Sequence, residues 1–121
     1  MIRVLLAEDH NVVRQGLSLL LSAQPDIQVV GEATNGREAV RFARESCPDV
    51  VVLDISMPEL DGLQATAMIR AECPQAQVLM LTMHESDAYF FRAVEAGAAG
   101  YLLKKAAGED LIHAVRAVAQ G

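Results

Sequence analysis

The sequence has no apolar stretch long enough to cross a bilayer. No hydrophobic run approaches the roughly 18 residues of a transmembrane helix, although 52% of the residues are hydrophobic. The apolar start at residues 1–7 is cut short by Glu8 and Asp9, and no basic leader or cleavage site accompanies it. These absences predict a first strand rather than a signal peptide, and a cytoplasmic protein with no membrane contact.

Cysteine is also scarce, with only Cys47 and Cys73 in the chain. The two lie far apart, each precedes a proline, and no histidine cluster accompanies them as it would at a zinc site. We therefore expect two reduced thiols without a structural role.

Basic residues are too few for a nucleic-acid-binding surface. Ten Lys and Arg residues against 16 Asp and Glu residues give a formal net charge of −6. Nucleic-acid affinity rests largely on Lys and Arg displacing counterions from phosphates. The chain alone is not expected to bind DNA.

What the sequence does contain is a strict alternation of strand-like and helix-like segments. Five apolar runs rich in β-branched residues predict strands at Ile2–Ala7, Ile27–Ala33, Val50–Leu53, Val78–Leu81 and Gly100–Leu103. Three of them are nearly continuous in Val, Ile and Leu, which is typical of strands buried on both faces of a parallel sheet. The alternation predicts an α/β fold with a doubly wound parallel sheet and helices on both faces. Periodicity leaves the strand order open.

The segments between the strands have helical periodicity. Gly36 and Asp61-Gly62 begin two helices, Asp61 acting as a cap, and Cys47-Pro48 and Cys73-Pro74 end two. The expected apolar faces are Val13/Leu17/Leu20/Leu21, Ala39/Val40/Ala43, Leu63/Ala67/Met68, Phe90/Ala93/Val94 and Leu111/Val115/Val118. With no linker, repeat or low-complexity tract, residues 1–121 are expected to form one domain.

Polar residues finish four of the five predicted strands. They are Glu8-Asp9, Asp54, Thr82 and Lys104, and ligands of open α/β sheets bind at this edge. Three neighbouring carboxylates need a cation, and Mg²⁺, with Mn²⁺ as a substitute, suits oxygen ligands at a small open site. Asp54 could then act as a nucleophile toward a phosphoryl group, whose oxygens Lys104 and Thr82 would contact.

These residues, with the intervening Asp54-Ile-Ser-Met57-Pro58-Glu-Leu-Asp61-Gly62 and Gly100-Tyr101-Leu-Leu-Lys104, resemble the signature of response-regulator receiver domains of two-component systems. The resemblance spans essentially the whole chain and implies the flavodoxin-like strand order 2-1-3-4-5. It also implies that Asp54 is the phosphoacceptor, that Glu8, Asp9, Asp54 and the Ser56 carbonyl hold the metal, that Thr82 and Lys104 sense the phosphoryl group, and that Tyr101 is a switch residue.

The sequences of two segments, Leu81-Thr82-Met83-His84 and residues 96–104, are similar to those of receivers of the NarL/FixJ type. The resemblance implies a sensor histidine kinase as partner, homodimerisation on phosphorylation, and transcriptional control through a LuxR-type DNA-binding domain that is absent from this chain. The dimer surface would lie on the fourth helix, fifth strand and fifth helix, or on the first and fifth helices. The alternative is a stand-alone receiver that signals by docking to another protein.

Several further residues are candidates for the rim of the expected pocket or lie close to it in the sequence. Met83 departs from the small residue usual after the threonine and is expected to hinder access to Asp54. Ser56, Met57 and His84 are candidate rim residues. His10 and His113 are expected to be solvated, although His10 could act as a base.

Three consecutive aromatic residues, Tyr89-Phe90-Phe91, occur on one predicted helix. At about 100° per residue they span too wide an arc to enter one core face together. At least one is expected to be exposed and to contribute either to a partner surface or to packing under a neighbouring loop.

Rival functions fit the sequence less well. A haloacid-dehalogenase-type phosphatase has a second Asp two residues after its nucleophile, whereas position 56 is Ser. No G-x-G-x-x-G turn or P-loop follows a strand, which disfavours a nucleotide-binding module. A receiver that has lost phosphorylation would lack site residues that are present here. We expect no enzymatic turnover beyond self-phosphorylation and autodephosphorylation.

Overall fold

Strands and helices alternate along the described residues. The computed structural model describes residues 1–55, 60–82, 87–104 and 108–120. Its elements are β1 (Ile2–Ala7), α1 (Asn11–Ser22), β2 (Ile27–Ala33), α2 (Gly36–Ser46), β3 (Val50–Asp54), α3 (Gly62–Glu72), β4 (Gln77–Thr82), α4 (Asp87–Ala96), β5 (Gly100–Leu103) and α5 (Glu109–Ala119). The five strands fall where the apolar runs predict them, to within one residue at each end.

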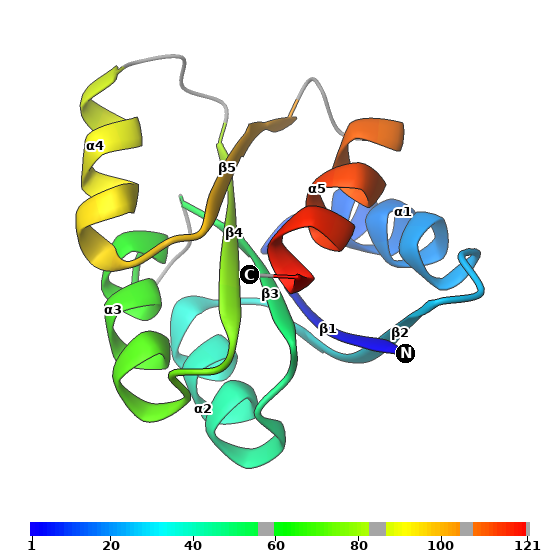
Figure 1. Cartoon of the computed structure of the whole chain (residues 1–121), viewed down its shortest axis with the longest axis horizontal. Coiled ribbons are helices and arrows are strands. Elements are labelled where there is room, and N and C mark those ends of the chain that lie inside the picture. The colour runs from blue at the N-terminus through cyan, green and yellow to red at the C-terminus, as the bar shows by residue number, and fades with distance from the viewer. Residues whose placement is uncertain (56–59, 83–86, 105–107, 121) are drawn as a thin grey trace.

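The five strands form one parallel sheet in the order β2-β1-β3-β4-β5. Helices α1 and α5 cover one face, and α2, α3 and α4 cover the other (Figure 1). This is the doubly wound, flavodoxin-like arrangement that the sequence and its resemblance predict. Because β1 and β3 lie at the centre, their carboxyl ends meet near the middle of one edge.

Apolar side chains fill both faces of the central strands. All five residues of β3 are buried, as are the last four residues of β1 and the last five of β4. One core lies under α2, α3 and α4 and includes Leu5, Leu53 and Met80, while the other lies under α1 and α5 and includes Leu6 and Leu81. Adjacent strand residues therefore anchor opposite layers, which fixes the strand register and the positions of the strand ends.

Side-chain caps define where two of the helices begin. The Asn35 side chain accepts a hydrogen bond from the Glu38 amide at the start of α2. Asp61 accepts one from the Gln64 amide at the start of α3, and the Gln64 side chain reaches back to the Asp61 amide. This reciprocal capping box confirms the prediction that Asp61 caps the third helix.

The apolar face predicted for α3 is wrong by part of a turn. Ala67 and Met68 are exposed, and the buried residues are instead Gly62, Ala65, Thr66 and Ile69. Thr66 can lie in the core because its hydroxyl donates a hydrogen bond of 2.7 Å to the Gly62 carbonyl. A polar residue on the inner face and a methionine on the outer face explain why hydrophobicity alone misplaces it.

The face predicted for α4 is right only for Ala93, since its large apolar residues point outward. Ala93 is buried, whereas Phe90, Phe91 and Val94 are 43%, 61% and 54% exposed. The expectation that at least one of the consecutive aromatic residues is exposed is therefore confirmed. The side chain of Tyr89 lies outside the described part of the structure.

The predictions for the two helices on the opposite face are largely confirmed. α5 buries Leu111, Val115 and Val118 as expected, and His113 is exposed. α1 buries Leu17 and Leu21 but leaves Val13 39% exposed at its first turn. No helix within the described residues is long and apolar enough to span a membrane.

The expectation of two reduced cysteines is wrong. Cys47 and Cys73 form a disulfide that joins the ends of α2 and α3. Their separation of 26 residues along the chain concealed the pairing, because only the packing of α2 beside α3 brings their Cα atoms to 5.9 Å.

Candidate functional site

The carboxyl ends of β1 and β3 bring two buried carboxylates together. Ala7 pairs with Leu53 in the sheet, so the residues that follow them, Glu8 and Asp54, come side by side. Glu8 is 0% exposed and Asp54 is 2% exposed. Oxygens of Glu8, Asp9 and Asp54 and a ring nitrogen of His10 all lie within 4.8 Å of one another. Such a concentration of acidic groups requires a compensating cation.

Lys104 supplies one such cation from the end of β5. Thr82 pairs with Leu103, so Lys104 follows directly beyond the strand next to β4. Its Nζ lies 2.7 Å from Glu8 Oε1 and 2.8 Å from Asp54 Oδ2. The contact with Asp54 is a directed hydrogen bond, whereas that with Glu8 is an ion pair without full hydrogen-bond geometry. One ammonium thus bridges the two buried carboxylates.

The ionic contacts override burial in setting the charges of this pair. Burial raises the pKa of Glu8, but Lys104, the His10 backbone amide and Asp9 together hold it at about 2, below its ordinary 4.5. Burial lowers the pKa of Lys104, but its contacts with Asp54 and Glu8 raise it above its ordinary value. Glu8 therefore stays ionised and Lys104 stays protonated at neutral pH.

One oxygen of Asp9 is left without a hydrogen-bond donor. Among the described residues, no hydrogen bond reaches the buried Oδ1 atom of Asp9, which lies 3.4 Å from His10 Nδ1. A buried acceptor without a donor is costly in a folded protein. The donor set of carboxylate oxygens suits a hard divalent cation such as Mg²⁺. The residues present therefore fit the metal that the sequence predicts.

Two residues at the start of α1 support this cluster and were not predicted in these roles. His10 is 64% exposed at its side chain, as expected, yet its Nδ1 atom lies 3.2 Å from Glu8 Oε2. Arg14 donates a hydrogen bond of 3.1 Å to the Glu8 carbonyl and another to Glu32 on β2. Arg14 thereby ties the turn after β1 to the neighbouring strand. Only its position one helical turn after His10, the residue that precedes α1, could have indicated this.

Thr82 and Tyr101 lie on the adjacent strands β4 and β5. Thr82 is fully buried at the end of β4. Tyr101 on β5 is half-buried and packs its ring edge-on against Phe90 of α4, with 5.7 Å between ring centroids. Tyr101 thus connects the strand that leads to Lys104 with the exposed surface of α4.

The backbone after Asp54 turns directly into contact with α3. The Ile55 amide donates to the Leu81 carbonyl, and the Gly62 amide donates to the Ile55 carbonyl, both at 2.9 Å. A side chain on Gly62 would lie 2.5 Å from the Asp54 carbonyl oxygen. Glycine is therefore required for α3 to start this close to Asp54.

Four of the candidate residues fall outside the described part of the structure. They are Ser56, with its expected carbonyl ligand, and the rim candidates Met57, Met83 and His84. Lys105, the neighbour of Lys104, lies outside it as well. The structure thus brings together Glu8, Asp9, Asp54 and Lys104.

Comparison with known proteins identifies the family to which this arrangement belongs. The model of the response regulator receiver domain family matches residues 4–116. The chain belongs to this family. The receiver is 36% identical to the signal receiver domain of the response regulator NarL from Mycobacterium tuberculosis, covering 99% of this chain and 97% of that one with a TM-score of 0.95. Its fold and its strand order are thus those of a receiver.

Other relatives include whole transcriptional regulators. The receiver is 45% identical to the transcriptional regulatory protein LiaR of Bacillus subtilis (strain 168) over 121 residues, which is 100% of this chain and 57% of LiaR. A LuxR-family two-component response regulator from Aurantimonas sp. SI85-9A1 is 39% identical with a TM-score of 0.95, over 100% of this chain and 86% of that one. The chain thus spans little more than half the length of the curated relative LiaR.

Proposed function

We propose that this receiver accepts a phosphoryl group on Asp54 and acts as the input domain of a two-component response regulator. The observation that carries the proposal is the position of Asp54: a 2% exposed carboxylate at the end of a central strand, 2.8 Å from the Lys104 ammonium and beside Glu8 and Asp9. A structural aspartate at a strand end has no need of two more carboxylates and a lysine around it.

Glu8, Asp9 and Asp54 would hold a divalent cation, with the Ser56 carbonyl as a further ligand. When bound, Mg²⁺ or Mn²⁺ would offset the negative charge of the phosphoryl oxygens. The Oδ1 atom of Asp9, which accepts no hydrogen bond from the described residues, is the ligand atom that supports this assignment most directly. The receiver itself holds the carboxylate ligands in place. Arg14 contributes by donating a hydrogen bond to the backbone carbonyl of Glu8.

In the transfer step, a carboxylate oxygen of Asp54 forms a new bond to phosphorus. The bond from phosphorus to the imidazole nitrogen of a phosphohistidine breaks, and its electron pair stays on that nitrogen. The histidine leaves as a neutral imidazole that carries a proton on its other ring nitrogen. Lys104 is already within 2.8 Å of Asp54 and can move its ammonium to an oxygen of the phosphoryl group. The product is an acyl phosphate on Asp54.

Phosphorylation would then change the surface through Thr82 and Tyr101. The phosphoryl group adds nearly two negative charges and strong acceptor oxygens. These oxygens attract the Thr82 hydroxyl and the Lys104 ammonium, and Tyr101 turns inward toward the space that Thr82 leaves. Because Tyr101 packs against Phe90, its movement changes the exposed face of α4. The two conformations pre-exist, and phosphorylation shifts their populations.

We propose a sensor histidine kinase as the phosphodonor and transcription as the output. The relatives named above include a transcriptional regulatory protein and a LuxR-family regulator, and both are longer than this chain. In the whole protein, the receiver would act in the cytoplasm and control DNA binding by a LuxR-type domain. A receiver that signals by docking to another protein is the alternative. In either case the receiver modifies only itself and turns over no separate substrate.

Homodimerisation is the proposed link between phosphorylation and output. Two surfaces carry exposed apolar side chains: Phe90, Phe91 and Val94 on α4, and Val12 and Leu19 on α1. Val12 is 83% exposed and Leu19 is 75% exposed. Burial of such residues between two copies would favour association.

Intact-protein mass spectrometry after incubation with acetyl phosphate tests the proposal. Wild type is expected to gain one phosphoryl group only when Mg²⁺ is present, and Asp54→Asn is expected to gain none. Asp61→Asn is the matched control, because Asn caps a helix as well as Asp does and Asp61 is an exposed cap. Full labelling of Asp54→Asn would refute the assignment, and continuous release of phosphate from a phosphomonoester would favour a phosphatase.

A further inference from the structure

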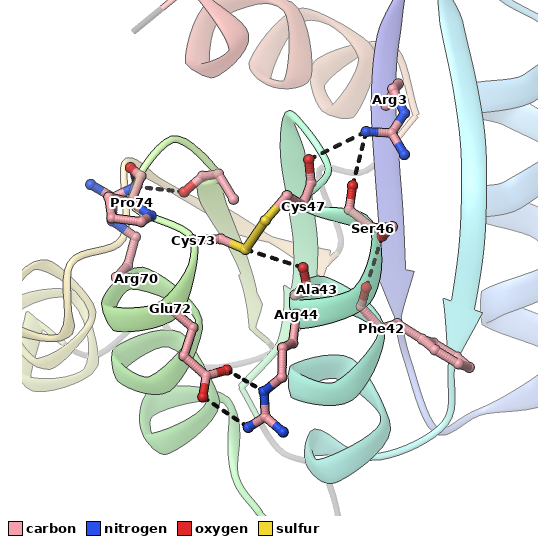
Figure 2. Close-up of a disulfide and its surroundings, with 11 residues drawn as sticks. Arg3, Phe42, Ala43, Arg44, Ser46, Cys47, Arg70, Glu72, Cys73 and Pro74 are labelled. Carbon is pink, nitrogen blue, oxygen red and sulfur yellow. Dashed lines mark hydrogen bonds and ion pairs between the residues drawn. A yellow bond between two sulfur atoms is a disulfide. The ribbon is translucent and has the colours of Figure 1, made fainter.

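The disulfide between Cys47 and Cys73 lies away from the acidic cluster, at the opposite ends of the helices that flank it. Cys47 is the residue that ends α2, and Cys73 is the residue that ends α3. Figure 2 shows the bridge spanning these two helix ends, beside the paired side chains of Arg44 and Glu72. The segment that it closes, residues 47–73, contains β3, Asp54 and all of α3.

The backbone at Cys47 indicates that a cysteine is there for its sulfur. Cys47 adopts φ 39° and ψ 68°, the left-handed conformation. Gly, or sometimes Asn, normally occupies such a position at a helix end, because other residues are strained there. A cysteine has no advantage over them for the turn itself, so the bond that it forms with Cys73 accounts for its presence.

The two cysteines differ in their exposure to solvent. Cys73 is 1% exposed, whereas Cys47 is only partly buried. An external thiolate can therefore attack the Cys47 sulfur and release Cys73. The released sulfur has a partner ready, because Cys73 Sγ lies 3.2 Å from the Ala43 carbonyl oxygen, which could accept a hydrogen bond from the free thiol (Figure 2).

The two helices remain joined by other contacts when the bridge is open. Arg44 and Glu72 form a pair of hydrogen bonds of 2.8 Å each. At the other end of α2, Gly36 lies so close to the Leu60 backbone that a side chain on Gly36 would overlap its carbonyl oxygen. Many buried residues of α2 and α3 also share one core. The fold therefore has support for both the bridged and the open state.

We propose that Cys47 and Cys73 form a reversible thiol–disulfide exchange site that responds to small thiols of the glutathione class. A thiolate attacks the Cys47 sulfur, forming a mixed disulfide and releasing the Cys73 thiolate. A second thiolate then attacks the outer sulfur, releasing the Cys47 thiolate and a small disulfide. Two electrons pass from two small thiols to the bridge, and their two protons are taken up by the two cysteine thiolates.

The consequence is that the redox state sets how firmly the α2 and α3 ends are held together. In the bridged state, residues 47–73 form a covalently closed segment around the proposed phosphorylation site. In the open state, the last turns of α2 and α3 are joined only by non-covalent contacts. The exchange chemistry needs neither phosphorylation nor a metal, so it stands or fails separately from the proposed function of Asp54.

The first experiment places the folded, unphosphorylated protein in glutathione buffers of graded redox ratio. Free thiols are then blocked with a maleimide and counted by intact-protein mass spectrometry. The expected result is a reversible change from the bridged form to the form with two labelled thiols, approached equally from either state. Opening that requires a denaturant, or failure of the reduced protein to close the bridge, would overturn the proposal.

Two single variants test the predicted order of attack. With oxidised glutathione, Cys73→Ser is expected to form a mixed disulfide at Cys47. Cys47→Ser is expected to react at Cys73 at least about tenfold more slowly, because Cys73 is buried. Equal rates in two variants with folded circular dichroism spectra would contradict the assignment. Hydrogen exchange of the wild type adds a readout: on reduction, the amides of Cys47 and Cys73, which close the last turns on Ala43 and Ile69, should exchange faster.

Discussion

Replacing Lys104 by methionine should destabilise the receiver because it leaves two buried carboxylates without their ammonium. Methionine keeps much of the length of the side chain and removes its charge. In the wild type, Nζ lies within 2.8 Å of oxygens on both Glu8 and Asp54. Removing one partner of a buried ion pair costs about 3–5 kcal/mol. Since the Lys104 side chain is 16% exposed, we expect the lower end, about 3 kcal/mol.

Urea unfolding measures this loss directly. With a typical slope of about 2 kcal/mol per molar urea, the midpoint should fall by about 1.5 M. Arg116→Met is the matched control, because it removes the same charge from a more exposed ion pair with Asp26, whose two side chains are 37% and 45% exposed. Its midpoint should move far less, since exposed ion pairs add little to stability. Equal shifts in Lys104→Met and Arg116→Met would refute the reasoning.

Two further conditions should narrow the difference between Lys104→Met and wild type. Mg²⁺ should stabilise the variant, because a cation bound among the carboxylates replaces the missing ammonium. Acid should do so as well: the variant loses the Lys104 contacts that lower the pKa of Glu8 against burial, so its carboxyl becomes neutral at a higher pH than in wild type and no longer needs a partner. A difference that grows in acid would contradict this account of the pair.

Three other predictions concern pH, the disulfide and a close backbone contact. The pKa of Glu8 is about 2 in the folded state against an ordinary 4.5. Its contribution to the free energy of unfolding, on the order of 3 kcal/mol, is therefore present above pH 4.5 and lost as the pH falls toward 2. A stability that stays constant over that pH range would contradict this prediction. Reduction of the bridge between Cys47 and Cys73, which are 26 residues apart, should lower the free energy of unfolding by about 3.5 kcal/mol, because the unfolded chain regains loop entropy. The same urea midpoint with and without a phosphine reductant would argue against this. Gly62→Ala should lower the stability by about 1–3 kcal/mol, because the added methyl group would overlap the Asp54 backbone. Gly16→Ala, where nothing lies within 4 Å, should raise the stability by about 0.5–1 kcal/mol. Thermal unfolding separates the two variants, and equal effects would show that the contact at Gly62 relaxes freely.

The strands and the site could be predicted from the sequence because both follow from one-dimensional order. Central strands buried on both faces are continuous apolar runs, and their ends are marked by the first polar residue. Glu8, Asp54 and Thr82 each stand at or just beyond the end of such a run. Once the strands are parallel, their ends must meet at one edge. The strand order itself came from the resemblance to receivers, since periodicity carries no information about it.

Helix rotation was harder to predict, because it depends on what each helix packs against. In α3, Thr66 is buried through its hydrogen bond to Gly62, while Met68 is 42% exposed. In α4, Phe90 and Val94 form an apolar stripe that looks like a core face but is exposed. Hydrophobicity cannot distinguish a stripe that faces the sheet from one available to a partner.

Two contacts that depend on the local packing of elements were not predicted. The pairing of Cys47 with Cys73 depends on the distance between two helix ends, and the hydrogen bond from Arg14 to the Glu8 carbonyl depends on the turn between β1 and α1. Each needs three-dimensional coordinates rather than a pattern of residue types. The tertiary packing therefore adds the residues that support the site, while the sequence already contained its central groups.

The edge-on contact between Tyr101 and Phe90 also gives the receiver an optical signal of its own. The chain has no tryptophan and only two tyrosines, so its near-ultraviolet circular dichroism near the tyrosine band comes from very few rings. A tyrosine held against another aromatic ring in a fixed orientation contributes strongly to that band, and the contribution changes if the ring rotates. In a Tyr89→Phe background, Tyr101 would be the single tyrosine, and its rotation could be followed in solution without any attached label.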